Sequence, residues 1–190
     1  LLRYFLSIGK QVGGYDRTPS ELTEKLIEEG AQIHYEDNVD LIDEVFKQKE
    51  TTLVIYTPAI PESHTELTYY RNHGFEIQKR SQVLGMLTCS GKGLCVAGTH
   101  GKTTTSTLAA WLNHAAAAEG SAFLGGISRN FASNRVLGEG RRLVVEADEY
   151  DRSFLRLHPD VAVITATDAD HLDIYGTPEA MVEAFGQFAE

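Results

Sequence analysis

The sequence is poor in several kinds of residue, and each shortage argues against a class of protein. Its 190 residues include only two cysteines, so a disulfide framework is not expected and a buried thiol is favoured over a disulfide or a metal site. Lysine and arginine number 17 against 27 aspartates and glutamates, for a formal net charge of -10. That balance argues against a nucleic-acid-binding surface, which needs massed basic side chains.

Long apolar runs are also missing. We find no stretch of about 18 apolar residues that could span a membrane, and no basic-then-apolar leader for secretion. Apolar residues still make up 42% of the chain, enough for one large or two small packed cores. We therefore expect a cytoplasmic protein that acts on small molecules, without a nucleic-acid or membrane partner.

Both ends of the sequence fall inside expected helices. The opening Leu-Leu-Arg-Tyr-Phe-Leu has helical spacing and no initiator methionine, and the last residues stop within an amphipathic helix that starts at Thr177-Pro-Glu179. The sequence therefore predicts a fragment of a longer protein.

The first half of the chain alternates short strands with helices. Strands are expected at 11–15, 31–34, 51–56 and 75–78, and helices at 1–8, 18–30, 40–46 and 62–73. The segment Thr18-Pro-Ser-Glu21 predicts a capping box with Pro19 at the first helical position. This alternation indicates an α/β fold with a parallel sheet covered by helices.

A second alternating unit follows a helix at 81–88 and a turn-rich segment, so we place a domain boundary near residue 90, between domains 1–89 and 90–190. Strands are expected at 94–97, 122–124, 143–146 and 161–165, and a long helix at 102–118. Trp111 has helical spacing from Leu108 and Leu112, which predicts a core position for it.

The segment Gly98-Thr-His-Gly-Lys-Thr-Thr104 lies where an expected strand meets a helix. In a phosphate loop, backbone N–H groups line a glycine-rich turn, a lysine reaches the terminal phosphates and a hydroxyl holds Mg²⁺. Gly98 and Gly101 permit the turn, while Lys102 and Thr103 supply the cation and the hydroxyl. The plainer alternative is a glycine-rich turn that only caps a helix.

Acidic residues follow two later strands. Glu146-Ala-Asp-Glu-Tyr-Asp151 carries four carboxylates, which repel one another unless cations share them. Asp170-His-Leu-Asp173 follows the next strand and includes His171. Open parallel sheets keep their sites at the carboxyl ends of strands. A solvated acidic turn and a structural histidine are the alternatives, and the phosphate loop in the same domain favours a metal or phosphate role.

These motifs together resemble a known family. Val96 stands where the general phosphate-loop pattern has its first glycine, and the Gly-Thr-x-Gly-Lys-Thr form resembles the ATP loop of the Mur ligase superfamily. Those enzymes add amino acids to the UDP-muramyl precursor of peptidoglycan. The two acidic motifs, in this order, resemble the second and third signatures of the alanine-adding ligases. The chain departs from the family at Thr165-Ala-Thr167, where Thr-Asn-Ile is usual, so the role of that asparagine is unassigned.

The resemblance implies a fold, cofactors and site residues. The fold would be a Rossmann-like N-terminal parallel-sheet domain that binds the UDP-sugar, followed by part of a P-loop ATP-binding α/β central domain. ATP and Mg²⁺ would be the cofactors, with Thr103, Glu146 and His171 as metal ligands and Lys102, Glu146 and His171 as catalytic residues. The implied ATP-binding residues are Gly98, Thr99, His100, Gly101, Lys102, Thr103 and Thr104. The implied substrate-binding residues are Asp16, Thr57, Pro58, Ala59, Ile60, His100, Gly125 and Gly126.

The implied reaction is the ATP-dependent addition of L-alanine to UDP-N-acetylmuramate through an acyl phosphate, in cytoplasmic peptidoglycan precursor synthesis. One alternative is a murein-peptide ligase that adds a tripeptide, although Ser153 to Pro159 looks more like the alanine-adding enzymes. Another is an inactive nucleotide-binding fragment, because the family's C-terminal domain for the amino acid is not in the sequence. A kinase or GTPase is disfavoured, since neither the kinase motifs nor Asn-Lys-x-Asp occurs.

Overall fold

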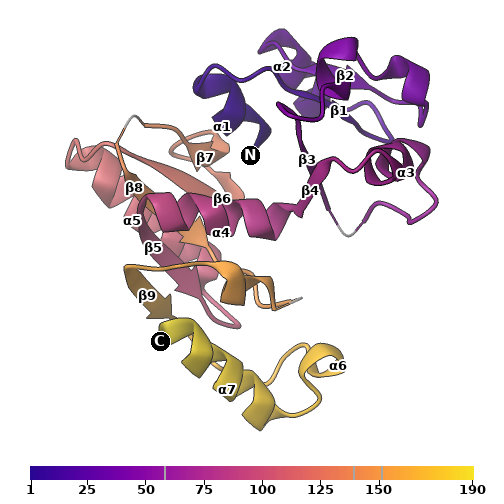
Figure 1. The fold of residues 1–190 in the computed structure, drawn as a ribbon. Coiled ribbons are helices and arrows are strands. Elements are labelled where there is room, and N and C mark those ends of the chain that lie inside the picture. Colours follow the sequence, from indigo (N-terminus) through magenta and orange to yellow (C-terminus); the bar gives the residue numbers. More distant parts are fainter. Residues whose placement is uncertain (58, 139, 151) are drawn as a thin grey trace. The chain divides into compact units, whose positions relative to one another are not determined.

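The chain forms two compact α/β units, Leu1–Arg80 and Ser81–Glu190, in a computed structural model that describes residues 1–57, 59–138, 140–150 and 152–190 (Figure 1). Parallel sheets with helices confirm the predicted fold class. The boundary expected near residue 90 lies at the far end of helix α4 (Arg80–Ser90), nearly all of which falls in the second unit. Pro58, from the predicted substrate-binding set, and Asp151, from the acidic motif, lie outside the described residues.

Short elements make up the first unit. In chain order they are α1 (Leu2–Ser7), β1 (Gly13–Tyr15), α2 (Glu21–Glu28), β2 (Gln32–His34), η1 (Val39–Leu41), η2 (Glu44–Lys47), β3 (Leu53–Tyr56), α3 (Thr65–Asn72) and β4 (Glu76–Lys79). Strand β1 pairs with β2, and β3 with β4, both in parallel. The parallel pairing follows the prediction, but these strands form two separate two-stranded sheets.

Two local predictions for this unit were wrong. The N-cap of α2 is Ser20, whose side chain accepts from the Thr23 N–H while the Thr23 hydroxyl accepts from the Ser20 N–H. Pro19 therefore precedes the cap and does not occupy the first helical position. The helix expected at 40–46 is two 3₁₀ turns, because the side chain of Asp43 accepts from the Val45 N–H and starts a new turn there.

Helix α3 is tied to the segment after β2 by Asp37. Its carboxylate accepts from the backbone N–H groups of Thr65 and Glu66 and from the Thr65 hydroxyl. Burial raises the pKa of Asp37, but these hydrogen bonds, Thr65's first, outweigh it and hold the pKa below its ordinary value. The resulting stabilisation is present above the ordinary pKa and is lost as pH falls through the lowered one.

The second unit is built on one five-stranded sheet. After α4 come β5 (Lys92–Ala97), α5 (Lys102–Ala115), β6 (Gly120–Ser128), β7 (Ser133–Val136), β8 (Arg142–Glu146), η3 (Ser153–Arg156), β9 (Val161–Ile164), α6 (Leu172–Tyr175) and α7 (Pro178–Ala189). The strand order is β7-β6-β8-β5-β9, parallel except for the β6–β7 pair, and β7 was not predicted. Thr177 caps α7 with Pro178 in its first turn, as predicted.

The core of the second unit centres on β5. Cys95, Val96 and Ala97 have no exposed surface. Burial raises the pKa of the Cys95 thiol to about 12, so it stays protonated at physiological pH. Cys95 thus confirms the expected buried thiol, whereas Cys89 is exposed; both are free.

Helix α5 covers the sheet with its small residues. Ser106 and Ala110 are buried, and Ala110 packs in the cluster that includes Ala122 and Val144. Trp111 is 38% exposed, Leu108 is 56% exposed and Leu112 is 60% exposed. The core position predicted for Trp111 was therefore wrong. Small side chains let the helix approach the sheet closely, and the larger ones are left on the outer face.

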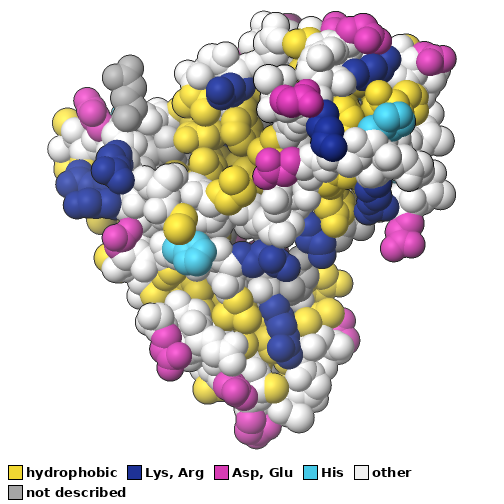
Figure 2. Space-filling model, in the orientation of Figure 1, with side chains coloured by type: hydrophobic (Ala, Val, Ile, Leu, Met, Phe, Trp, Pro, Cys, Tyr) yellow, Lys and Arg dark blue, Asp and Glu magenta, His cyan; other side chains and the backbone are white. Residues whose placement is uncertain are grey.

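Charged side chains of both signs are dispersed over one face of the molecule (Figure 2). On the face drawn in Figure 2, lysines and arginines lie in small groups among acidic side chains. None of the helices in the described part of the chain is long and apolar enough to cross a bilayer.

Two helical glycines provide a test of this packing. A Cβ at Gly85 in α4 would overlap the carbonyl oxygen of Arg156, whereas one at Gly186 in α7 would meet nothing within 4 Å. We expect Gly85→Ala to lower the free energy of unfolding by about 1–3 kcal/mol. Gly186→Ala should raise it by about 0.5–1 kcal/mol through helix propensity. Urea unfolding of both variants measures this, and equal effects would contradict the packing of α4 on the segment after β8.

Candidate functional site

Three strand ends meet at one edge of the five-stranded sheet. Strand β5 pairs in parallel with β8 and β9, with Val96 opposite Glu146 and Ala97 opposite Ile164. The next hydrogen bonds, from Ala147 N–H to the Val96 carbonyl (2.9 Å) and from Thr165 N–H to the Ala97 carbonyl (3.0 Å), extend the pairing. The phosphate-loop motif and both acidic motifs therefore leave the sheet side by side.

The loop after β5 needs its two glycines. Gly98 has φ of +127° and Gly101 has φ of +81°, both in the region that favours glycine. A Cβ on Gly98 would also collide with the Thr165 hydroxyl and lie 2.8 Å from the Ala166 nitrogen. That hydroxyl donates to the Ala97 and His100 carbonyls, so the segment after β9 fixes the loop.

The loop leads into the N-terminus of α5. Gly101 is the N-cap residue, and no side chain in the described chain caps this helix. The first backbone N–H groups of α5 and the positive end of its dipole are thus suited to an anion. Thr99 is buried and anchored through its N–H to the Ala166 carbonyl and through its hydroxyl to the Asp168 N–H.

Lys102 is held in a partly buried ion pair. Its ammonium group donates to the Gly98 carbonyl at 2.7 Å and to Glu149 Oε1 at 2.8 Å. The Glu149 side chain is 1% exposed, and such a buried carboxylate needs a cation beside it. Glu149 was not among the predicted site residues, because the sequence gives only its membership of an acidic run.

Glu146 is held by three hydrogen bonds. Its carboxylate accepts from the Thr103 hydroxyl at 2.9 Å, the Ser106 hydroxyl at 3.3 Å and the Gly125 N–H at 2.7 Å. A Cβ on Gly125 would overlap that carboxylate, so glycine is required there for close approach. The fold therefore brings together three predicted residues: Thr103, Glu146 and Gly125. Gly126 lies beside them, since a Cβ on it would be 3.3 Å from the Thr103 methyl group.

The three predicted metal ligands are not assembled to the same degree. Thr103 and Glu146 are in contact, but His171 Nε2 lies 4.0 Å from Glu149 and 3.8 Å from Asp170. No group of three His, Cys, Asp or Glu residues arranged for a metal exists among the described residues. A hydroxyl and one carboxylate nevertheless fit Mg²⁺, which commonly takes few protein ligands and completes its shell with water and substrate phosphates.

The two site histidines differ in environment. His171 has φ of +49°, precedes α6 and packs edge-on against the ring of Tyr150, with 5.1 Å between centroids. His100 is 70% exposed and lies 3.8 Å from Asp168. Thr104 is exposed on the first turn of α5.

The predicted substrate residues of the first unit sit after two different strands. Asp16 follows β1 and its carboxylate accepts from the Thr18 N–H at 3.2 Å. Thr57 follows β3, and its carbonyl accepts from the Ile60 N–H at 3.1 Å to close a turn that includes exposed Ala59. No described contact joins Asp16 to this turn, so their common role stays a prediction.

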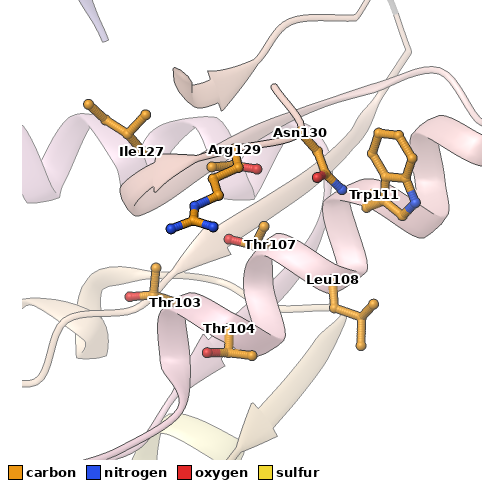
Figure 3. A pocket seen from close by; sticks show the side chains of 9 residues that line it. Thr103, Thr104, Thr107, Leu108, Trp111, Ile127, Arg129 and Asn130 are labelled. Atoms are coloured by element: carbon orange, nitrogen blue, oxygen red, sulfur yellow. The ribbon is translucent and has the colours of Figure 1, made fainter. Parts of the chain in front are cut away.

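A hollow of about 400 Å³ lies beside the phosphate loop within the second unit. It is lined by α5 and the end of β6 with its following residues: Thr103, Thr104, Thr107, Leu108, Trp111, Ile127, Ser128, Arg129 and Asn130. In Figure 3 the guanidinium of Arg129 extends toward Thr107, while Asn130 lies near Trp111. Cation, hydroxyls and indole together suit a polar ring that bears an acid group.

Comparison with known proteins agrees with these features. Residues 1–92 match the model of the Mur ligase family, catalytic domain, and residues 96–190 match that of the Mur ligase middle domain. A UDP-N-acetylmuramate–L-alanine ligase from Phocaeicola vulgatus is 65% identical over 189 residues, which cover 99% of this chain and 41% of that protein. The chain thus spans less than half the length of this relative.

Solved structures show the same fold. The UDP-N-acetylmuramate-alanine ligase MurC from Thermotoga maritima matches with a TM-score of 0.82 at 27% identity, over 98% of this chain and 43% of that one. A UDP-N-acetylmuramate:L-alanyl-gamma-D-glutamyl-meso-diaminopimelate ligase from Neisseria meningitides matches with a TM-score of 0.84 at 24% identity, over 98% and 62%. At that identity the second match speaks for the fold alone.

The two loop glycines should respond differently to alanine. Gly98→Ala combines a left-handed φ with a collision, and we expect it to lower the free energy of unfolding by about 2–4 kcal/mol. Gly101→Ala keeps the left-handed φ, but its nearest neighbour would be 3.7 Å away. It should cost only about 1 kcal/mol. Chemical unfolding compares the two, and the reverse order would contradict the loop geometry.

Proposed function

The chain belongs to the Mur ligase family, and we therefore propose that it is the nucleotide- and UDP-sugar-binding part of a UDP-N-acetylmuramate–L-alanine ligase. The observation that carries the proposal is the convergence of Lys102, Thr103 and Glu146 at the open edge of the sheet, beside an uncapped helix N-terminus. The names of the relatives support the choice of substrates. ATP, UDP-N-acetylmuramate and L-alanine would be the small-molecule substrates, in the cytoplasm where nucleotide sugars and ATP are available.

The proposed reaction joins a carboxylate to an amine, which is uphill in water. The muramyl carboxylate would attack the γ-phosphate of ATP to give an acyl phosphate and release ADP. The amino group of L-alanine would then attack the acyl carbon, lose a proton and displace phosphate to form the amide. The backbone N–H groups at the start of α5 and the ammonium of Lys102 would bind the phosphates and offset the charge of two approaching anions. Thr103 and Glu146 would hold Mg²⁺, which when bound supplies further charge neutralisation, with His171 as the third proposed ligand.

The other predicted residues complete this proposal. Residues 1–89 would form the Rossmann-like UDP-sugar domain, with Asp16 and the turn of Thr57, Ala59 and Ile60 at the nucleotide. Residues 90–190 would form the ATP-binding part, with the loop from Gly98 to Thr104 on the phosphates. The muramyl group of UDP-N-acetylmuramate would be contacted by Gly125, Gly126 and His100. Its carboxylate-bearing sugar ring would lie in the hollow beside Arg129.

Nucleotide binding tests the central element. We expect the 190-residue chain to bind a non-hydrolysable ATP analogue with Mg²⁺, and Lys102→Ala to weaken that binding at least tenfold, about 1.4 kcal/mol or more, by isothermal titration calorimetry. The matched control is Lys92→Ala, which removes an exposed lysine from the opposite end of β5 and should change affinity less than about twofold. Equal affinity of the Lys102 variant and the parent chain, with circular dichroism unchanged, would overturn the assignment.

The hollow can be tested in the same way. Arg129→Ala should weaken binding of UDP-N-acetylmuramate by roughly three- to tenfold, because a charge-assisted hydrogen bond is lost. Arg142→Ala, an exposed arginine at the start of β8, serves as the control and should leave binding unchanged. Unaltered binding by the Arg129 variant would remove the hollow from the proposed acceptor site while leaving the ATP site untouched.

The choice of amino acid needs the longer protein. In a full-length ligase containing this chain, phosphate release should depend on L-alanine and not on the tripeptide L-alanyl-γ-D-glutamyl-meso-diaminopimelate. Tripeptide-dependent release would favour the murein-peptide ligase, and binding without any release would favour a binding module.

A further inference from the structure

The buried carboxylate of Glu149 lies against Lys102, a residue of the proposed ATP site. The Glu149 side chain is 1% exposed, yet only Oε1 is bonded, and Oε2 is buried without a hydrogen-bond partner among the described residues. Leaving half of a buried carboxylate unsatisfied costs free energy. An arrangement of this kind persists only where other parts of the structure fix it.

The backbone of Glu149 is fixed from the segment after β9. The Tyr175 hydroxyl donates to the Glu149 carbonyl at 2.6 Å, and Tyr175 is 5% exposed. The guanidinium of Arg152 lies over the Tyr175 ring, 4.9 Å from its centroid. The backbone of Glu149 is therefore held by α6 independently of the side chain of Lys102.

The ammonium group of Lys102 is oriented by two hydrogen-bond acceptors. A lysine ammonium group has three N–H bonds to donate. Two are accounted for in this structure, by the Gly98 carbonyl at 2.7 Å and by Glu149 Oε1 at 2.8 Å. Because one acceptor is a backbone carbonyl and the other a buried side chain, the direction of the third N–H is restricted. Lysine is otherwise a flexible point charge that loses much rotamer entropy when a ligand orders it.

We propose that Glu149 is a positioning residue for Lys102, which with the Gly98 carbonyl holds the ammonium group so that its remaining N–H meets the terminal phosphate of ATP. The inference rests on the proposed function, because it presupposes a nucleotide in the loop. It adds that part of the selectivity for a triphosphate comes from a buried carboxylate that acts through Lys102.

The charge of Glu149 provides an opposing effect that the experiment must separate. A carboxylate near the phosphates repels them, and its removal alone would favour the more highly charged nucleotide. Loss of positioning has the opposite consequence. A Lys102 side chain that is no longer oriented would weaken ATP binding more than ADP binding, because only ATP carries the terminal phosphate that the ammonium group is proposed to reach. The ratio of ADP to ATP dissociation constants therefore changes in opposite directions for the two effects.

The test is this ratio for Glu149→Gln, measured with Mg²⁺ by calorimetry using ADP and a non-hydrolysable ATP analogue. We expect the preference for the triphosphate to fall about fivefold, and the Lys102 ammonium signal in ¹H–¹⁵N NMR to lose its protection from exchange with water. Glu149→Asp, which keeps the charge on a shorter side chain, should give a smaller fall. Glu183→Gln, on the exposed face of α7, removes one charge at a distance and should leave the ratio unchanged.

Other outcomes overturn the inference separately from the proposed function. A rise in the preference for the triphosphate would mean that Glu149 acts by repulsion, and an unchanged ratio with a folded protein would leave it a purely structural role. Either result would leave the ATP site intact. Absence of nucleotide binding by the unsubstituted chain would instead overturn both proposals. If Glu149→Gln does not fold, the Glu149→Asp ratio decides, and no fall there contradicts the inference.

Discussion

The parallel pairing of β5 with β8 on one side and β9 on the other is the constraint on which the whole candidate site depends. Parallel strands end at the same edge, so the loop from Gly98, the acids from Glu146 and the segment from Thr165 are delivered to one place. Three consecutive residues of β5, Cys95, Val96 and Ala97, have no exposed surface, so both faces of the strand are buried at the end from which the loop leaves. This buried end of β5 thereby fixes where the loop from Gly98 begins.

The two glutamates of the acidic motif show how environment separates chemically equal groups. Glu146 is only partly buried, and its carboxylate accepts hydrogen bonds from neutral hydroxyl and backbone donors. It can therefore bind a cation in their place. Glu149 is buried and relies on the ammonium of Lys102. Glu146 is therefore suited to bind a cation at the edge of the site, and Glu149 to hold the ammonium group of Lys102 from the buried side. Close approach at this edge is possible only because Gly98 and Gly125 lack a Cβ.

Local patterns were informative where a single local interaction decides the structure, and misleading where a tertiary contact or a competing side chain decides it. The cap at Thr177 was predicted because a helix start needs only its own neighbours. Trp111 was predicted to lie in the core from its helical spacing. Spacing identifies a helix face but not which face packs on the sheet, and in α5 that is the face of Ala110. The helix expected at 40–46 failed because the side chain of Asp43 competes for the backbone, a contest that periodicity does not register.

The α/β class, the position of the glycine-rich loop and the order of the three motifs could be predicted without coordinates, because glycine placement, strand-to-helix transitions and acidic runs are properties of neighbouring residues. Which carboxylate faces which partner could not be predicted in this way. In the folded chain Glu146 accepts from Thr103, Glu149 pairs with Lys102, and His171 Nε2 lies 4.0 Å from Glu149. These contacts join residues 22 to 47 positions apart, so strand register and burial, which act between distant segments, choose among the carboxylates.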